Sequence, residues 1–392
     1  MFKVKTHNRI SPKGLNQLPS ADYEVSEDHQ DPDALIIRSY KVSDEDLCDE
    51  LKAIGRAGAG VNNVPVDQCT EKGIVVFNTP GANANAVKEL VIAGMLLAAR
   101  NVAPAIEFVN GLEANDEMEG VVEKQKATFK GSEIQGKRLG VIGLGAIGLM
   151  VANAGVALGM KVQGYDPFIS VNRAWALSQD VEKASSLEKL LKESDYISIH
   201  VPYTVDTQSF FNKERLSHVK QGATVLNFSR ANLVETDAMI GCLDSGQIYR
   251  YVTDFPSAAT VKHGSVISIP HLGASTEEAE DNCAVMIANQ IQNFLEHGTI
   301  ENSVNFPACS LDRSSAHRLV IANKNVPNVI GKVSTILAEA SINIVEWINK
   351  SRDDLAYNIL DIDQAVPDDQ LSKIRDLEEV NVLRVLPEWN PA

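Results

Sequence analysis

The chain has 392 residues, more than one hydrophobic core usually organises, so we expect two or three domains. Its 36 basic and 52 acidic side chains give a formal net charge of -16, which argues against nucleic acid or an anionic membrane as a partner. The five scattered cysteines predict neither a disulfide framework nor a metal site. We expect a cytoplasmic protein, because the N-terminus has no signal-like apolar stretch and no apolar run approaches the ~20 residues that span a bilayer.

The first ninety residues alternate short apolar runs with polar helical stretches, a pattern typical of a small α/β layer. Strands are expected at residues 2–5, 34–37 and 73–76. A Thr79-Pro80-Gly81 turn then precedes a long helix at about 85–100. This helix is apolar on most sides, so we expect it to be buried as a connector between domains.

From residue 137 onward, short apolar strands alternate with helical stretches, and strands that are buried on both faces predict a doubly wound parallel sheet. A long helix at 275–297 should then pack back on the first domain. The closing segment has the order βαββαβ, which predicts a ferredoxin-like module. The expected strands of the sheet are 138–142, 161–165, 196–200, 223–227, 251–254 and 265–269, and the elements of the module are 317–323, 328–340, 342–349, 355–362, 368–377 and 382–386.

A dinucleotide fingerprint stands in the parallel block. Gly143, Gly145 and Gly148 have the GxGxxG spacing, directly after a strand and at the start of a helix. Asp166 ends the next strand, eighteen residues after the last glycine, where a carboxylate binds the ribose hydroxyls and repels a 2′-phosphate. A purely structural glycine turn is the alternative. The complete context favours NAD as the cofactor, in preference to NADP.

Polar residues at the ends of the later strands are the catalytic candidates, because ligands of open α/β sheets bind beyond the carboxyl ends of the strands. Arg230, Asp254 and His271 follow three of these strands. The imidazole of His271 could accept a hydroxyl proton, and the guanidinium of Arg230 could bind a carboxylate. Taken alone, His271 could instead be a capping or core histidine, and Arg230 could be a surface residue in an ion pair. His200, at another strand end, is assigned no chemistry.

These motifs form an ordered set along nearly the whole chain, and on this set the chain resembles the D-isomer-specific 2-hydroxy-acid dehydrogenase family. Its final module resembles an ACT regulatory domain. The resemblance implies a Rossmann-type NAD-binding domain at 93–274, a flavodoxin-like substrate domain at 1–92 completed by 275–305, and an ACT domain at 312–392. The motifs are Arg38-Ser39, Ala57 to Asn63, Asn83, Glu89-Leu90, the glycine fingerprint, Ser229-Arg230, Asp254 and His271 to Ser275.

The resemblance also assigns residues to roles. Arg230 and His271 would be the catalytic pair. A small-molecule substrate would contact Arg38, Ser39, Ala59, Gly60, Asn83 and Lys126, although a solvated lysine is the alternative for Lys126. We expect a homodimer or homotetramer that pairs through the cofactor domain. The implied cofactor contacts are Gly143, Gly145, Ala146, Ile147, Gly148, Asp166, Phe228, Ser229, Asp254, Gly273 and Ala274.

The sequence departs from the family at the partner of the catalytic histidine. The usual glutamate lies five residues beyond the aspartate, where this chain has Ala259. No glutamate occurs between Glu235 and Glu277, so the partner of His271 stays open.

The ACT-like module departs from the family in its loop as well. By resemblance, Asn323, Asn325 and Asn343 would bind an L-serine effector between paired modules. Asn323 stands where a histidine is common, and Asn328 stands where a glycine is common.

Two other functions compete with a dehydrogenase of a phosphorylated substrate. One is a related enzyme acting on a plain 2-hydroxy acid such as glycerate or lactate. The other is an NAD-sensing binding protein on the same fold. The presence of both Arg38 and Lys126, together with the ACT-like module, favours an enzyme that acts on a phosphorylated substrate and is regulated.

Overall fold

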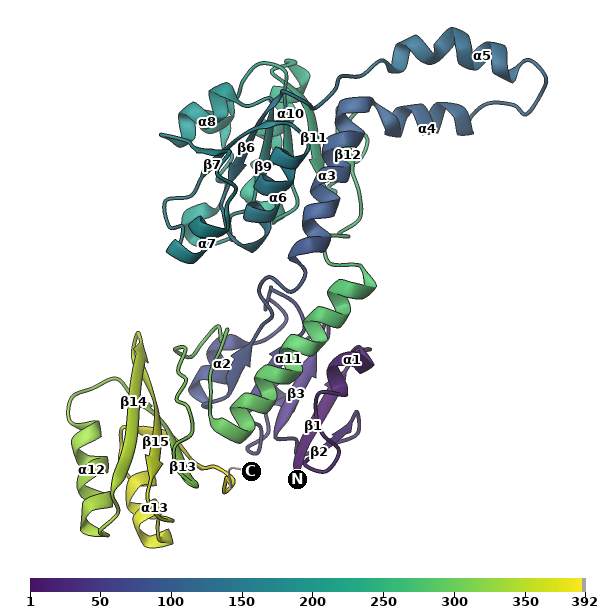
Figure 1. The fold of residues 1–392 in the computed structure, drawn as a ribbon. Coiled ribbons are helices and arrows are strands. Elements are labelled where there is room, and N and C mark those ends of the chain that lie inside the picture. The colour runs from purple at the N-terminus through teal and green to yellow at the C-terminus, as the bar shows by residue number, and fades with distance from the viewer. Residues whose placement is uncertain (390–392) are drawn as a thin grey trace. The chain divides into compact units, whose positions relative to one another are not determined.

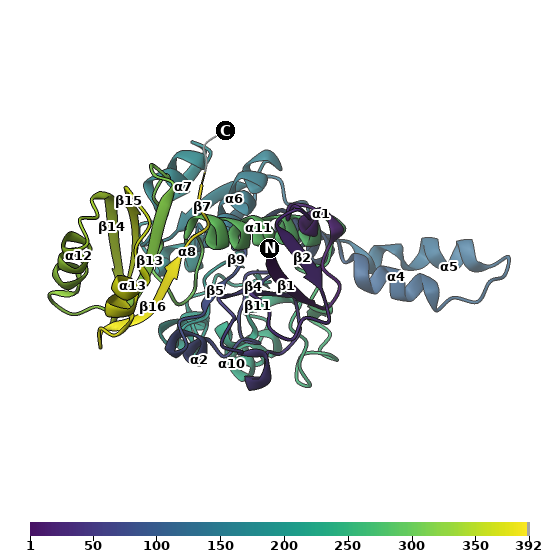
Figure 2. The same cartoon turned by 90° about the horizontal axis from the view of Figure 1, so that it is seen from below.

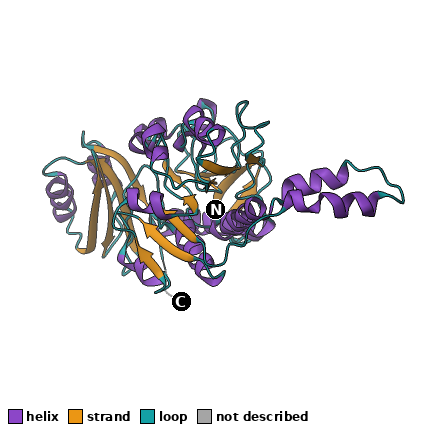
Figure 3. Cartoon of the chain, turned by 90° about the horizontal axis from the view of Figure 1, so that it is seen from above, coloured by secondary structure: helices purple, strands orange, loops and turns teal. Residues whose placement is uncertain are grey.

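The computed structural model describes residues 1–389, and its contacts divide the chain into two compact units. The first unit comprises Met1–Ala82 and Glu280–Ala392, and the second comprises Asn83–Ala279. Figure 1 labels their helices and strands, and Figure 3 shows helices covering sheets throughout.

The first unit contains a five-stranded parallel sheet in the order β2-β1-β3-β4-β5. This is the flavodoxin-like order, and it places the carboxyl ends of all five strands at one edge. The three expected strands are present, and two short strands that sequence reasoning missed, β2 and β4, complete the sheet. The strands are β1 Phe2–His7, β2 Tyr23–Ser26, β3 Ala34–Ile37, β4 Ala53–Arg56 and β5 Val75–Phe77, with α1 Pro12–Leu15, η1 Asp44–Asp46 and α2 Val66–Glu71 between them.

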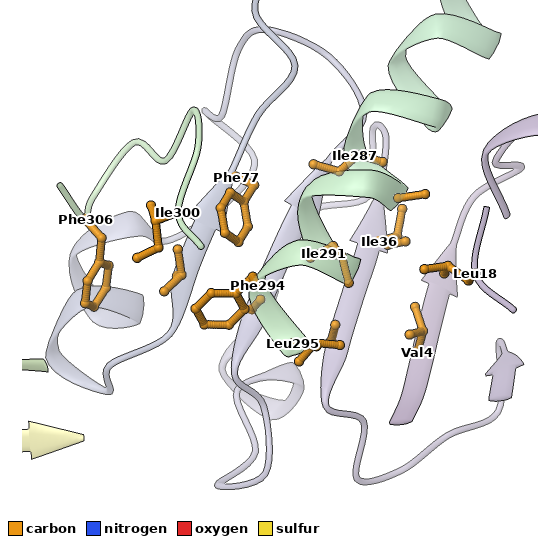
Figure 4. Packing of buried hydrophobic residues seen from close by; sticks show 14 of the residues in the cluster. Val4, Leu18, Ile36, Phe77, Ile287, Ile291, Phe294, Leu295, Ile300 and Phe306 are labelled. Atoms are coloured by element: carbon orange, nitrogen blue, oxygen red, sulfur yellow. The ribbon is translucent and has the colours of Figure 1, made fainter. Parts of the chain in front are cut away.

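The long helix α11, Glu277–His297, packs on this sheet as predicted. Its apolar side chains recur at the helical spacing and point toward the strands (Figure 4). Ile287, Ile291 and Leu295 have no exposed surface, and Phe294 meets the ring of Phe77 edge-on at 5.5 Å. A sequence-distant helix thus covers the sheet that carries the predicted substrate residues.

The C-terminal module has the predicted βαββαβ order and forms an antiparallel sheet in the order β14-β15-β13-β16. Two helices line one face, where they bury an apolar layer that includes Leu319, Ile321 and Leu337 (Figure 2). The intervening residues Val320 and Ala322 face the core of the first unit instead, as the alternation of a strand requires. The elements are β13 His317–Lys324, α12 Val329–Glu339, β14 Ile344–Arg352, β15 Leu355–Ile362, α13 Asp368–Arg375 and β16 Val380–Val385.

The buried side chain of Arg318 ties this module to the chain that precedes it. Arg318 and Asp361 are fully buried, and the guanidinium donates from Nε and Nη2 to the two carboxylate oxygens at 2.6 and 2.9 Å. Its other donors reach the carbonyls of His297, Leu311 and Asp312. The ion pair joins β13 to β15 within the module, where removing one partner would cost about 3–5 kcal/mol, and the three carbonyl contacts attach the module to the preceding chain.

The second unit contains a seven-stranded parallel sheet in the order β12-β11-β10-β9-β6-β7-β8. The order reverses between β6 and β9, which is the switch point where ligands of doubly wound sheets bind. The α/β class with parallel sheets is therefore confirmed. The strands are β6 Arg138–Ile142, β7 Lys161–Tyr165, β8 Val181–Lys183, β9 Tyr196–Ile199, β10 Ala223–Asn227, β11 Ile248–Thr253 and β12 Val266–Ser268.

Helices cover both faces of this sheet. The long helix α3 packs against α6 and against β10 and β11 of the same unit. Phe228 and Val252 leave no room for a side chain at Gly94, on the face of α3 that meets the sheet. The helices are α3 Ala84–Arg100, α6 Ala146–Ala157, α7 Val171–Ala176, α8 Leu187–Glu193, α9 Lys213–Ser217 and α10 Thr236–Asp244, with η3 Val205–Thr207 and η4 Ala231–Leu233.

Between α3 and the parallel sheet the chain forms a helical hairpin that the sequence did not predict. It consists of α4 Val102–Asn110, α5 Met118–Gln125 and the short η2 Lys126–Phe129. The two helices lie side by side and project from the second unit in both views (Figures 1 and 2). No single helix among the described residues is long and apolar enough to cross a membrane, and α3 with α4 passes that test only as a pair bent by 70°.

Candidate active site

The glycine loop lies at the carboxyl end of β6, next to the switch point. Gly143 has φ +86°, and a Cβ there would lie 2.5 Å from the carbonyl oxygen of His200. A Cβ on Gly148 would lie 1.9 Å from the oxygen of Gly143. Both close approaches require glycine. Gly145 is the N-cap of α6, so the first amides of that helix have no partner within the helix and can bind a phosphate.

The neighbouring residues complete a dinucleotide cradle. Asp166 follows β7, and its two carboxylate oxygens accept hydrogen bonds from the amides of Leu144 and Phe168 at 2.8 and 2.9 Å. The carboxylate therefore lies beside the glycine loop, where a ribose would meet it. His200 follows β9, and its Nε2 lies 2.8 Å from the hydroxyl of Ser198. Burial lowers the pKa of His200 to about 3, so its ring is neutral and adds no charge to the cradle.

Arg230 lies in a turn after β10 whose backbone is held by side-chain hydrogen bonds. The buried side chain of Asn227 donates to the carbonyl of Arg230 at 3.0 Å and accepts from the amide of Ser229 at 3.1 Å. The hydroxyl of Ser229 donates to the carbonyl of Ile199 on the neighbouring strand at 2.7 Å. Phe228 is buried beneath the turn. The backbone that carries the exposed guanidinium is thus held by the sheet, and within residues 1–389 the guanidinium itself hydrogen-bonds only to the carbonyl of Ser229.

Asp254 follows β11 and is buried, with 1% of its surface exposed. Its Oδ2 accepts from the amide of Gly273 at 3.3 Å, and its Oδ1 is buried without a hydrogen-bond partner. Burial raises the pKa of Asp254, and the positive charges of His271 and Arg230 oppose that rise. Arg230, Asp254 and His271 come after the neighbouring strands β10, β11 and β12, so they lie along one carboxyl edge of the sheet. The unpaired Oδ1 is suited to an amide donor such as a carboxamide.

His271 contacts an aromatic ring. Its imidazole packs against Phe255 with ring centroids 4.9 Å apart and planes 56° apart. Within residues 1–389, no hydrogen bond or ion pair joins His271 to a carboxylate, and Glu235 instead accepts from the amide of Lys213. Ala259, at the position of the usual glutamate, lies exposed in a turn. No carboxylate hydrogen-bonds to His271 among the described residues; Phe255 packs against its ring, and the charge of Asp254 interacts with it.

The first unit carries a second polar edge, formed by the ends of β3 and β4. Arg38 follows β3, and its Nη2 pairs with Glu280 Oε1 at 2.7 Å. Ser39 is held by Asn8, whose Oδ1 accepts from the Ser39 amide at 2.9 Å. The carbonyl of Ala59 accepts from Asn78 at 2.7 Å, and Gly60 follows it in the same loop. These four predicted substrate residues therefore lie on adjacent strand ends.

Arg56 is a cation at this edge that sequence reasoning missed. It ends β4, and its Nε donates to the carbonyl of Arg38 at 3.1 Å. A Cβ on Gly58 would lie 1.7 Å from Arg56 Nη1, so the guanidinium packs directly under the loop that contains Ala59. Sequence reasoning missed it because Arg56 ends β4, a short strand that was not predicted.

The two remaining substrate candidates have different surroundings. Asn83 is the N-cap of α3, although its side chain makes no capping hydrogen bond. Lys126 begins η2, where its ammonium pairs with Glu123 one turn earlier, and both side chains are largely exposed. No described contact joins Lys126 to Arg230 or His271.

The structure separates the three predicted effector residues. Asn323 is buried in β13, and its amide bonds to Lys324 and Asn358 inside the sheet. Strands β13 and β14 run in the same direction, each antiparallel to β15, so Asn325 and Asn343 lie at opposite ends of the sheet. Eight residues of strand separate them by roughly 25 Å. The register therefore keeps Asn325 and Asn343 apart within one module, and their expected site between paired modules stays a prediction.

The comparisons with known proteins agree with this geometry. The model of the "D-isomer specific 2-hydroxyacid dehydrogenase, NAD binding domain" matches residues 92–273. The D-3-phosphoglycerate dehydrogenase of Methanocaldococcus jannaschii is 34% identical over 334 residues, 83% of this chain and 61% of that protein. The enzyme of the same name from Haemophilus influenzae is 32% identical over 349 residues, 86% of this chain and 82% of that protein.

A solved structure is also similar. The NAD+-bound 3-phosphoglycerate dehydrogenase of Entamoeba histolytica superposes with a TM-score of 0.62 at 27% identity, over 78% of this chain and 98% of that chain. The chain spans 57–64% of the length of several curated relatives. The matched NAD-binding region contains the glycine loop, Asp166, Arg230, Asp254 and His271. The chain therefore belongs to the D-isomer-specific 2-hydroxyacid dehydrogenase family, and NAD is the cofactor that its second unit is built to bind.

Proposed function

We propose that this chain oxidises D-3-phosphoglycerate to 3-phosphohydroxypyruvate with NAD, the first step of the phosphorylated route to L-serine. The observation that carries the proposal is the position of Arg230, Asp254 and His271 at the carboxyl ends of three adjacent strands of the parallel sheet. The names of the two relatives above, one of which the chain covers to 82%, support the substrate. The second polar edge, which contains Arg38 and Arg56, supports a ligand with two anionic groups.

The proposed roles follow from the positions of the side chains. Arg230 pairs with the substrate carboxylate through its planar guanidinium. The imidazole of His271 accepts the proton of the C2 hydroxyl as a hydride leaves the same carbon, and later releases that proton to water. Bound NAD supplies the hydride acceptor. Asp254 Oδ1, buried and unpaired, accepts a hydrogen bond from the carboxamide of the nicotinamide and thereby orients the ring.

The remaining substrate contacts come from the first unit and from Lys126. Arg38, Ser39 and the backbone of Ala59 and Gly60 bind the anionic groups of the substrate in this proposal. Arg38 is already paired with Glu280, so the substrate competes with a carboxylate for this guanidinium.

The C-terminal module is proposed to be an ACT domain that binds L-serine and inhibits the enzyme. Its βαββαβ order and antiparallel sheet support this assignment. A cavity of about 390 Å³ is lined by Asn343 and by residues of α12, including Ser334 and Thr335. Because Asn325 lies at the far end of the same sheet, we propose that one serine is held by Asn343 of one module and Asn325 of a second.

We further propose a homodimer, at least, in the cytoplasm. The helical hairpin exposes Ile106 and Val109 on α4 and Met118 and Val121 on α5, and the two members of each pair are three residues apart. That spacing aligns them on one face of each helix, where a second copy could bury them. All five cysteines are free in the structure, in keeping with a reducing compartment.

A substrate panel tests the proposed reaction. NADH formation is measured with D-3-phosphoglycerate, D-glycerate and D-lactate, and kcat/KM should be highest for the phosphorylated acid. Arg38→Ala should raise the KM for D-3-phosphoglycerate far more than it lowers kcat, because a group remote from the reacting carbon supplies uniform binding. Glu280→Gln is the matched control, because it breaks the same ion pair but keeps the guanidinium. A preference for a plain hydroxy acid would contradict the proposal.

A further inference from the structure

The glycine loop contains no positively charged side chain that could pair with the phosphates of a dinucleotide. Between Gly143 and Gly148 its side chains are those of Leu144, Ala146 and Ile147, all apolar. The pyrophosphate of NAD carries negative charge, and the chain has a net charge of -16. Backbone amides and the dipole of α6 alone would have to offset this repulsion. A nearby positive side chain would therefore have a large effect on cofactor affinity.

Arg173 supplies such a charge. A Cβ placed on Gly145, the residue that opens α6, would have one neighbouring heavy atom within 4 Å, and that atom is Arg173 Nη1 at 3.8 Å. The guanidinium thus lies over the point where the backbone comes closest to a pyrophosphate. Across the part of the chain that the structure describes, the side chain of Arg173 makes no hydrogen bond or ion pair. Its donors remain available for a ligand.

The backbone beneath Arg173 is fixed relative to the loop. Helix α7 begins after Ser170, whose hydroxyl accepts from the Arg173 amide at 3.4 Å. The side chain of Asn153, on α6, donates to the carbonyl of Ala176 at 3.0 Å and accepts from the amide of Ser178 at 2.8 Å. Asn153 therefore joins the end of α7 to the same helix that the glycine loop opens. This attachment holds Arg173 beside the loop.

We propose that Arg173 binds the pyrophosphate of NAD through charge-assisted hydrogen bonds and is the main side-chain contact of these phosphates. The proposal deepens the NAD-binding role of the second unit and does not depend on which hydroxy acid is oxidised. It places the guanidinium on the phosphates, in contrast to Asp166, which faces the ribose.

Calorimetry on the full chain without substrate tests this contact. The dissociation constants of NAD, ADP and adenosine are compared for the wild type, Arg173→Ala and Arg173→Lys. NAD and ADP should bind about tenfold more weakly to Arg173→Ala, as expected for loss of a hydrogen bond between charged groups. Arg173→Lys should recover part of the affinity. Adenosine has no phosphate, so its affinity should not change.

Lys161→Ala is the control, because Lys161 is an exposed cation at the opposite end of β7. It should bind NAD like the wild type. Added salt should weaken NAD binding less steeply in Arg173→Ala than in the wild type. Unchanged NAD affinity in a folded Arg173→Ala variant would overturn the proposal, and so would equal losses for ADP and adenosine. NADP is titrated as well, because a selective loss of NADP affinity would place the guanidinium at the ribose and would also overturn the proposal. Because no turnover is measured, a wrong substrate assignment leaves this test intact.

Discussion

His271 and Phe255 pack ring against ring at the carboxyl edge of the parallel sheet, where the family resemblance leads one to expect a carboxylate. An aromatic neighbour cannot accept the imidazole proton, but it can restrict the orientation of the ring. A base that swings away from the substrate loses the short hydrogen bond that proton transfer needs. At the scale of single residues, we therefore propose that packing against Phe255 helps to orient the imidazole.

We expect Phe255→Ala to lower kcat by about ten- to a hundredfold while KM changes little, because the misplaced ring affects proton transfer more than binding. Phe255→Tyr keeps an aromatic ring and should retain most of the activity. The measurement is steady-state NADH formation. A rise in KM with an unchanged kcat would show instead that Phe255 acts on substrate binding.

His200 gives a prediction about acid stability. Its folded pKa of about 3 lies below the value near 6.5 of an unfolded histidine, so only the unfolded chain takes up a proton between these values. Stability should therefore fall as the pH drops below about 6.5, by about 1–2 kcal/mol at pH 5 from this group.

The test is urea unfolding of the wild type and His200→Gln, followed by circular dichroism at pH 7.5 and pH 5. The variant should lose less stability than the wild type on acidification. Between pH 7.5 and 8.5 His200 is neutral in both states, so no further difference should develop. Parallel losses in both proteins at pH 5 would rule out His200 as the source.

At the scale of elements, strand register decides how the C-terminal module can bind a ligand. Asn343 precedes β14 and Asn325 follows β13, and the parallel course of these two strands keeps the residues at opposite ends. A ligand that needs both must therefore lie between two modules.

L-serine should inhibit the full chain, and Asn325→Ala and Asn343→Ala should each relieve the inhibition without changing basal turnover, since the effector and substrate sites are distinct. Mixing the two variants is the sharper test. A mixed dimer should keep one site with both asparagines, so inhibition should partly return. No return on mixing would mean that the two residues serve one module. Absence of both serine binding and inhibition would remove the regulatory proposal.

At the scale of the whole molecule, the helical hairpin α4–α5 leaves four apolar side chains exposed, and a second copy is the proposed cover. Val109→Asp together with Val121→Asp should convert a dimer to a monomer, because each would place a charge in a buried interface. Light scattering after size-exclusion chromatography measures the mass. Val205→Asp is the control, since Val205 is 90% exposed outside the hairpin. A monomeric wild type would contradict the proposal.

Features that depend on residues close together in the sequence could be predicted from local sequence patterns. The glycine spacing and Asp166 indicate a dinucleotide loop, because backbone conformation and helix capping are set within a few residues. The apolar runs at 138–142, 161–165 and 223–227 correspond to β6, β7 and β10, since strands buried on both faces need continuous apolar residues. The order of the C-terminal elements could also be predicted from local sequence patterns.

Contacts between distant residues were decided only by the tertiary structure. The edge strands β2 and β8 are too brief to show a period, and they form because the longer neighbouring strands β1 and β7 offer unpaired edges. The place of Arg56 under the Gly58 loop and the separation of Asn325 from Asn343 depend on packing and register. Register is set by which side chains fill the core, and the residues that fill it come from both ends of the chain.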